Sequence, residues 1–172
     1  MPDDRIPVSL YEQDFDTWAF GQAAALRAVR DAILQGAGGP AELLRAIDWE
    51  NLAEEIEGLG RRDRRELASR LALIVEHLAK LEFSSAVEPR AGWIASVERE
   101  RSDLDDILED SPSLRREVPN FLARRAGKAA KGAARSLELH GETDAAKACL
   151  RRVGTGYTVD EVLGDWIPDP VS

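Results

Sequence analysis

The chain has 172 residues, enough for one domain with its own core, and its 44% hydrophobic and 32% charged residues argue against disorder and against a membrane protein. A single cysteine excludes an internal disulfide framework and a zinc site built from several thiolates. The net charge of −9 argues against general affinity for nucleic-acid phosphates, although residues 61–140 carry 16 basic and 14 acidic side chains and leave room for a local basic face.

The first predicted helix covers residues 10–35. Ser9 and Glu12 have the spacing of a capping box, and apolar residues recur after them at helical intervals. The glycine-rich stretch 36–40 ends this helix, and residues 41–46 are expected to form a short helical turn.

The next segment, residues 48–83, is predicted to form a helix-turn-helix hairpin. Asp48 is the expected N-cap of its first helix, and Gly58 and Gly60 bracket the expected C-terminus, where a left-handed residue is often needed. A second capping box at Asp63 then begins another helix. Leucine and isoleucine alternate in steps of four and three along it, which is the seam of a helix packed along a neighbour. The seam residues are Leu67, Leu71, Ile74, Leu78 and Leu81.

Residues 84–89 break the helical pattern, and a fourth helix takes up the apolar positions from Trp93 to Leu108. Ser111 and Pro112 place a cap before a first-turn proline, and Pro119 begins the alanine-lined fifth helix.

Gly141 ends the fifth helix, residues 143–153 form a shorter helix, and Thr158 with Glu161 caps a last short one. Residues 154–172 are predicted to act as a C-terminal clip that holds the tail onto the bundle. No stretch has the two-residue alternation of a strand. The predicted fold is therefore all-α, a single helical domain over residues 1–172 built as a bundle of four or five long helices with short additional helices.

Several motifs along the chain resemble those of a known bacterial family. They are Tyr11-x-x-Asp14-Phe15-x-x-Trp18, the run from Asp48 to Arg61, Glu66-Leu67-x-Ser69-Arg70-Leu71, His77-Leu78-x-Lys80 and Ser111-Pro112-Ser113-Leu114. With these motifs the sequence resembles the bacterial domain of unknown function number 29 family. The resemblance implies a helical bundle and supplies no established activity.

One candidate for a buried polar cluster involves His77, Glu100 and Arg101. The apolar face of the fourth helix is interrupted at Glu100, and counting back about a turn near residue 87 brings this position level with His77. Buried charges must be paired, so the cluster is expected to be structural, while a role of His77 as general base or pH switch stays open.

Three further features are candidate binding sites. Arg61 and Arg62, which follow a glycine turn and precede a helix N-terminus, have the parts of an anion site or of an ordinary glycine cap. An acidic stripe on one side of the second helix consists of Glu50, Glu54 and Glu57. A basic stripe on the fifth helix consists of Arg124, Lys128, Lys131 and Arg135. Either these two stripes are solvated helix faces, or they meet each other, or each binds a partner.

The leading functional hypothesis is a non-enzymatic, cytoplasmic interaction protein that presents charged helix faces to a protein partner or to itself. No catalytic constellation surrounds any serine or Cys149. A carboxylate and histidine metal enzyme is the alternative, but neither His77 nor His140 follows a Glu by three residues as the di-iron pattern requires, and we predict no metal ligand or cofactor. Nucleic-acid binding through the basic stripe is the third hypothesis. No membrane association is expected.

Overall fold

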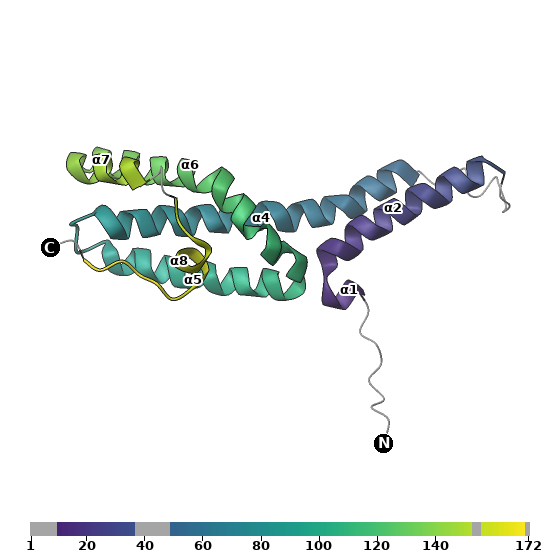
Figure 1. The fold of residues 1–172 in the computed structure, drawn as a ribbon, viewed down its shortest axis with the longest axis horizontal. Helices are drawn as coiled ribbons and strands as arrows, with labels where there is room; N and C mark the ends of the chain where they lie inside the picture. The colour runs from purple at the N-terminus through teal and green to yellow at the C-terminus, as the bar shows by residue number, and fades with distance from the viewer. Residues whose placement is uncertain (1–9, 37–48, 153–155, 171–172) are drawn as a thin grey trace, which may run out of the picture. The chain divides into compact units, whose positions relative to one another are not determined.

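A computed structural model describes residues 10–36, 49–152 and 156–170. In these ranges the chain is helical and has no strand, which confirms the predicted all-α class (Figure 1). The elements are α1 (Leu10–Gln13), α2 (Phe15–Leu34), α4 (Trp49–Phe83), α5 (Arg90–Asp110), the 3-10 helix η1 (Pro112–Glu117), α6 (Val118–Leu139), α7 (Thr143–Arg152) and α8 (Val159–Leu163).

The internal contacts of the chain divide it into two compact units. Unit 1 comprises Met1–Arg64 with Leu108–Leu114, and unit 2 comprises Arg65–Ile107 with Arg115–Ser172. Each unit is described below by itself. The single domain expected from the chain length stays a prediction.

The predicted hairpin over residues 48–83 is wrong, because α4 is one continuous helix through Gly58 and Gly60. Neither glycine has the positive φ of a C-cap, unlike Gly36 and Gly141. A glycine inside a helix costs only about 1 kcal/mol, which the buried apolar seam farther along α4 can offset. The predicted cap at Asp48 lies outside the described residues, as do Ser9 and residues 41–46.

Gly60 has a packing role instead of a terminating one. A Cβ atom at this position would lie 2.9 Å from Cε2 of Phe20 and 3.2 Å from Oδ1 of Asp16. A side chain at this position would force the Phe20 ring to move, so glycine favours the close approach of α2 to α4. Gly58 has no such neighbour, since the nearest atom to its Cβ would be Nη2 of Arg61 at 3.8 Å.

The first predicted helix is interrupted at Asp14, which separates α1 from α2. Asp14 has an extended backbone, and its carboxylate accepts a hydrogen bond from the N–H of Thr17 at 3.0 Å. This is N-cap geometry, and it begins α2 at Phe15. Within unit 1, α2 then runs antiparallel to α4, with the small side chains of Ala19, Ala23 and Ala53 fully buried between other groups.

Unit 2 contains a core of branched aliphatic side chains. The predicted leucine and isoleucine seam of α4, from Leu67 to Leu81, has no exposed surface. Helix α5 contributes Val97 and Leu104 to the buried set, and α6 contributes Val118, Leu122 and a row of alanines. The helices of unit 2 form a bundle, as Figure 1 shows.

The end of α6 and the beginning of α8 follow local signals in the sequence. Gly141, with a φ of +83°, follows α6, and the capping box of Thr158 and Glu161 begins α8 as predicted. The guanidinium group of Arg101 on α5 donates to the carbonyl oxygens of Glu161 and Val162 within α8, and of Trp166 beyond it, at 2.8–2.9 Å. Main-chain contacts therefore attach the tail to α5.

Candidate functional site

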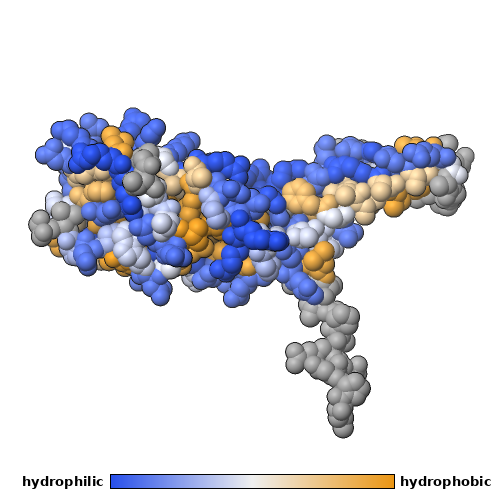
Figure 2. Space-filling view, in the orientation of Figure 1, coloured by the Kyte–Doolittle hydropathy of each residue, from blue (hydrophilic) through white to orange (hydrophobic). Residues whose placement is uncertain are grey.

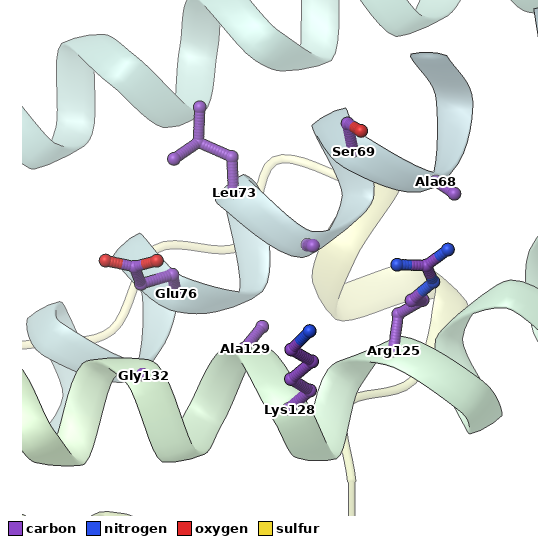
Figure 3. A pocket seen from close by; sticks show the side chains of 9 residues that line it. Ala68, Ser69, Leu73, Glu76, Arg125, Lys128, Ala129 and Gly132 are labelled. Carbon is purple, nitrogen blue, oxygen red and sulfur yellow. The ribbon is translucent and has the colours of Figure 1, made fainter. Parts of the chain in front are cut away.

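A groove of about 420 Å³ lies between α4 and α6 in unit 2 (Figure 3). Small side chains face each other there, so the two helices leave open space between them. We call this site the cationic groove. Its lining consists of Ala68, Ser69, Ala72, Leu73 and Glu76 from α4 and of Arg125, Lys128, Ala129 and Gly132 from α6.

Two cations give the cationic groove its character. The side chains of Arg125 and Lys128 extend from α6 toward α4 (Figure 3). Among the described residues, neither forms an ion pair, whereas the one acidic group of the lining, Glu76, already accepts a hydrogen bond from Nζ of Lys80 at 2.7 Å. Positive charge is therefore available to an incoming group.

The predicted basic stripe lies on the exposed surface of α6, and Lys128 belongs both to it and to the cationic groove. Arg124 donates to the carbonyl oxygen of Asn120 at 3.1 Å and lies over the ring of Phe121. Lys131 and Arg135 are exposed, and no ion pair within the described ranges involves either. Sequence reasoning missed Arg125, because it lies outside the steps of four, three and four residues that define the stripe.

The predicted acidic stripe has partners inside unit 1. Arg27 of α2 forms ion pairs with Glu50 and Glu57, and Arg30 pairs with Glu50. The hydrogen bond from the Arg27 guanidinium, supported by the charge of Arg27 and by Arg61, keeps the pKa of Glu57 below its usual value. The side chain of Glu54 is exposed. The stripe thus helps to join α4 to α2.

The anion site expected at Arg61 and Arg62 is not formed, because the helix does not end there. The backbone N–H groups that a helix N-terminus would leave free belong to the interior of α4. Arg61 pairs with Glu57 at 3.0 Å and also donates to the carbonyl oxygen of Glu54. Both arginine side chains are otherwise exposed.

Glu100 is a buried carboxylate with partners other than those expected. Its side chain accepts hydrogen bonds from Arg70 at 2.8 Å and from Arg99 at 3.4 Å. Arg70 also pairs with Glu66 and Asp103. The cluster of His77, Glu100 and Arg101 is therefore not formed as expected.

Arg101 donates to the main-chain carbonyl oxygens of Glu161, Val162 and Trp166, so it is not the expected partner of His77. The Nδ1 atom of His77 is buried and has no hydrogen-bond partner among the residues that the structure describes. Burial, followed by the positive charge of Lys80, lowers the pKa of His77, while Glu76 and Glu100 oppose this shift. His77 is consequently a neutral side chain at physiological pH.

A second polar cluster, in unit 1, was not identified as a site from the sequence. Asp16 is 2% exposed, and Arg64 donates to its carboxylate through Nε at 3.0 Å and Nη2 at 2.8 Å. Ser111 accepts a hydrogen bond from the Asp16 N–H, and Ser113 donates to Asp14 at 2.9 Å. We call these five residues the Asp16 cluster.

Residues of the Asp16 cluster are far apart in the sequence, so no spacing rule could bring them together. Part of the signal was present, since Asp14 and the Ser111 to Leu114 run belong to motifs that carry the family resemblance. The cluster is saturated with internal hydrogen bonds, which makes it an architectural element of unit 1.

Metal-binding clusters and membrane-spanning helices are both absent from the part of the chain that the structure describes. No group of three or more His, Cys, Asp and Glu side chains could hold a metal ion there. Nor does any helix there combine the length and the apolar character that crossing a bilayer requires.

Comparison with known proteins places the chain in a family. No curated protein and no solved structure was found to match it. Residues 10–166, which contain every motif that carries the family resemblance, match the domain of unknown function DUF29. The chain therefore belongs to the DUF29 family.

Proposed function

We propose that the protein is a helical interaction module that binds an acidic segment of a protein partner in the cationic groove and along the basic stripe of α6. The observation that carries the proposal is the pair of cations, Arg125 and Lys128, at an open groove where neither forms an ion pair with the described residues. Exposed Lys131 and Arg135 extend the positive surface along the same helix.

The shape and chemistry of the groove suit a helix better than a flexible polyanion. Alanine and glycine at its floor allow a partner backbone to approach closely, and Leu73 adds an apolar contact. Glu76 in the lining and the net charge of −9 both disfavour binding of a nucleic-acid backbone, because all of its charged groups are negative phosphates. An amphipathic helix with carboxylates toward α6 fits these groups.

The test is affinity capture with the intact protein and with a variant whose groove charges are reversed. The variant changes four cations to glutamate, namely Arg125, Lys128, Lys131 and Arg135. We expect the partners captured by the wild type to be lost, because attraction to their carboxylates becomes repulsion. An unchanged set of partners contradicts the proposal.

A matched control carries the same change of net charge elsewhere on unit 2. It reverses four exposed cations that lie outside the groove, namely Arg115, Arg116, Lys147 and Arg151. This control should retain the partners, and both variants should keep the helical circular dichroism of the wild type. Retention of DNA or RNA by the wild type at low salt, lost in the groove variant, would favour nucleic-acid binding over the proposal.

A further inference from the structure

The helix pair of unit 1, α2 with the part of α4 that ends at Arg64, has two different long sides. One side carries the ion pairs that Arg27 and Arg30 form with Glu50 and Glu57. Large apolar side chains outside that ladder stay accessible to solvent: Val29 is 47% exposed, Leu52 42% and Leu59 39%. Figure 2 shows a band of hydrophobic surface along this part of the molecule.

Helical geometry gathers these apolar residues on one side of the pair. The antiparallel contacts Arg27–Glu57 and Arg30–Glu50 fix how each helix is rotated about its axis. At about 100° per residue, two runs then lie on the side away from the ion pairs. The runs are Leu26, Val29 and Ile33 on α2, and Leu52, Ile56 and Leu59 on α4.

Two helices packed side by side cannot by themselves bury an apolar side that both of them share. Stable helical architectures bury such a stripe against further helices, and a pair of helices completes a four-helix bundle by adding two more. Contiguous exposed apolar surface on a protein is typical of an association site. We call the two apolar runs together the unit 1 apolar face.

Charges beside this face indicate which partner it takes. Glu55 and Arg62 lie two helical turns apart on α4, on the stripe next to Leu59. Both are exposed, and neither takes part in an ion pair within the described ranges. Suppose that two copies of α4 pack antiparallel about a two-fold axis near Leu59. Glu55 of each copy then faces Arg62 of the other copy, which gives two equivalent ion pairs.

We propose that the protein forms a two-fold symmetric dimer through the unit 1 apolar face. Two helices from each copy together form a four-helix bundle. Leu52 and Leu59 lie in its centre, and two symmetric Glu55–Arg62 ion pairs lie at its edge. A surface with an apolar centre and opposite charges at equal distances from it is complementary to itself. The proposal is independent of the cationic groove, which lies in unit 2.

The mass of the intact protein in solution tests the dimer, measured by light scattering and sedimentation. The wild type should have twice the mass of the chain. The double variant Val29→Glu with Leu59→Glu should be a monomer, because it places charges in the apolar centre. Val87→Glu is the matched control, since Val87 is 84% exposed in unit 2, and it should remain a dimer.

Charge exchange tests the two-fold geometry separately from the apolar contact. Glu55→Arg alone and Arg62→Glu alone should each weaken the dimer by roughly tenfold, because like charges then face each other. The double exchange should restore wild-type affinity. Circular dichroism confirms that every variant is folded.

Three outcomes overturn the proposal. The first is a wild-type monomer at the highest soluble concentration, including one that holds a different protein through this face. The second is a dimer that survives the double glutamate variant. The third is a double charge exchange that fails to restore affinity.

Discussion

In unit 2 the buried side chains are largely leucine, isoleucine and valine, whereas in unit 1 α2 and α4 meet through alanine and glycine. Unit 1 instead joins its helices by ionic contacts, from the exposed Arg30–Glu50 pair to the pair that Arg64 forms with the buried Asp16. Apolar burial of a large side chain contributes about 1.5–3 kcal/mol, whereas an exposed ion pair contributes about 0–1 kcal/mol. The comparison shows that the core of unit 2 depends on buried volume, whereas the contact of α2 with α4 in unit 1 depends on specific polar geometry.

This difference also predicts where the protein opens first. Helices with few buried apolar contacts and exposed hydrogen bonds have low local stability. Amide hydrogens of α2 should therefore exchange faster than those of α4 between Arg65 and Phe83.

The largest effect is expected for Leu71→Ala in unit 2. Leu71 has no exposed surface, so the substitution removes buried methyl groups and leaves a cavity. The free energy of unfolding should fall by about 3–5 kcal/mol, measured by urea denaturation. Leu34→Ala in unit 1 is the control, at about 1 kcal/mol or less, because Leu34 is 66% exposed. Equal losses would contradict the difference between the units.

The next effect is expected for Asp16→Ala, which leaves Arg64 without its buried partner. Loss of one member of a fully buried pair costs about 3–5 kcal/mol, but Arg64 is 36% exposed and regains water, so we expect about 1–3 kcal/mol. Urea denaturation and the amide exchange of α2 measure it. Glu66→Ala, which removes a surface partner of Arg70, should cost less than about 1 kcal/mol.

The two glycines of α4 should respond with opposite signs. Gly60→Ala forces its Cβ against Phe20 and Asp16 and should destabilise the protein by about 1–2 kcal/mol. Gly58→Ala has space for the methyl group and should stabilise it by up to about 1 kcal/mol. Thermal denaturation of both variants is the measurement. Stabilisation by both would show that Gly60 has no packing role.

The smallest effect concerns pH. The pKa of His77 lies below its ordinary value of 6.5 in the folded protein, so the unfolded chain binds the proton more readily. The free energy of unfolding should therefore fall as pH decreases through 6.5, and be unaffected by this group at higher pH. Denaturation at pH values on both sides of 6.5 should show a weaker dependence for His77→Gln. His140→Gln, at an exposed ring, is the matched control.

The parts of the fold that the sequence predicts are those set by local signals. The break after Phe83, the end of α6 before Gly141 and the capping box at Thr158 each depend on residues within one turn of the boundary. The apolar seam of α4 could also be predicted, because a long periodic pattern identifies one face of the helix as the buried one.

The parts that could not be predicted depend on contacts between distant residues. Gly60 has the sequence signature of a helix end, and only the position of Phe20 shows that it is a packing glycine. The burial of Glu100 follows from the interrupted apolar face, but its partner Arg70 lies on another helix and pairs through a register that no spacing reveals. The Asp16 cluster combines segments about 95 residues apart for the same reason.

Arg101 attaches the tail through carbonyl oxygens of the main chain, not through side chains. Every amino acid supplies the same carbonyl group, so the identity of the tail residues is free to change without loss of these three hydrogen bonds. The information for this attachment is stored in α5, at one arginine. A substitution within the tail can disturb the attachment only by moving its backbone, whereas a change of Arg101 removes all three hydrogen bonds at once.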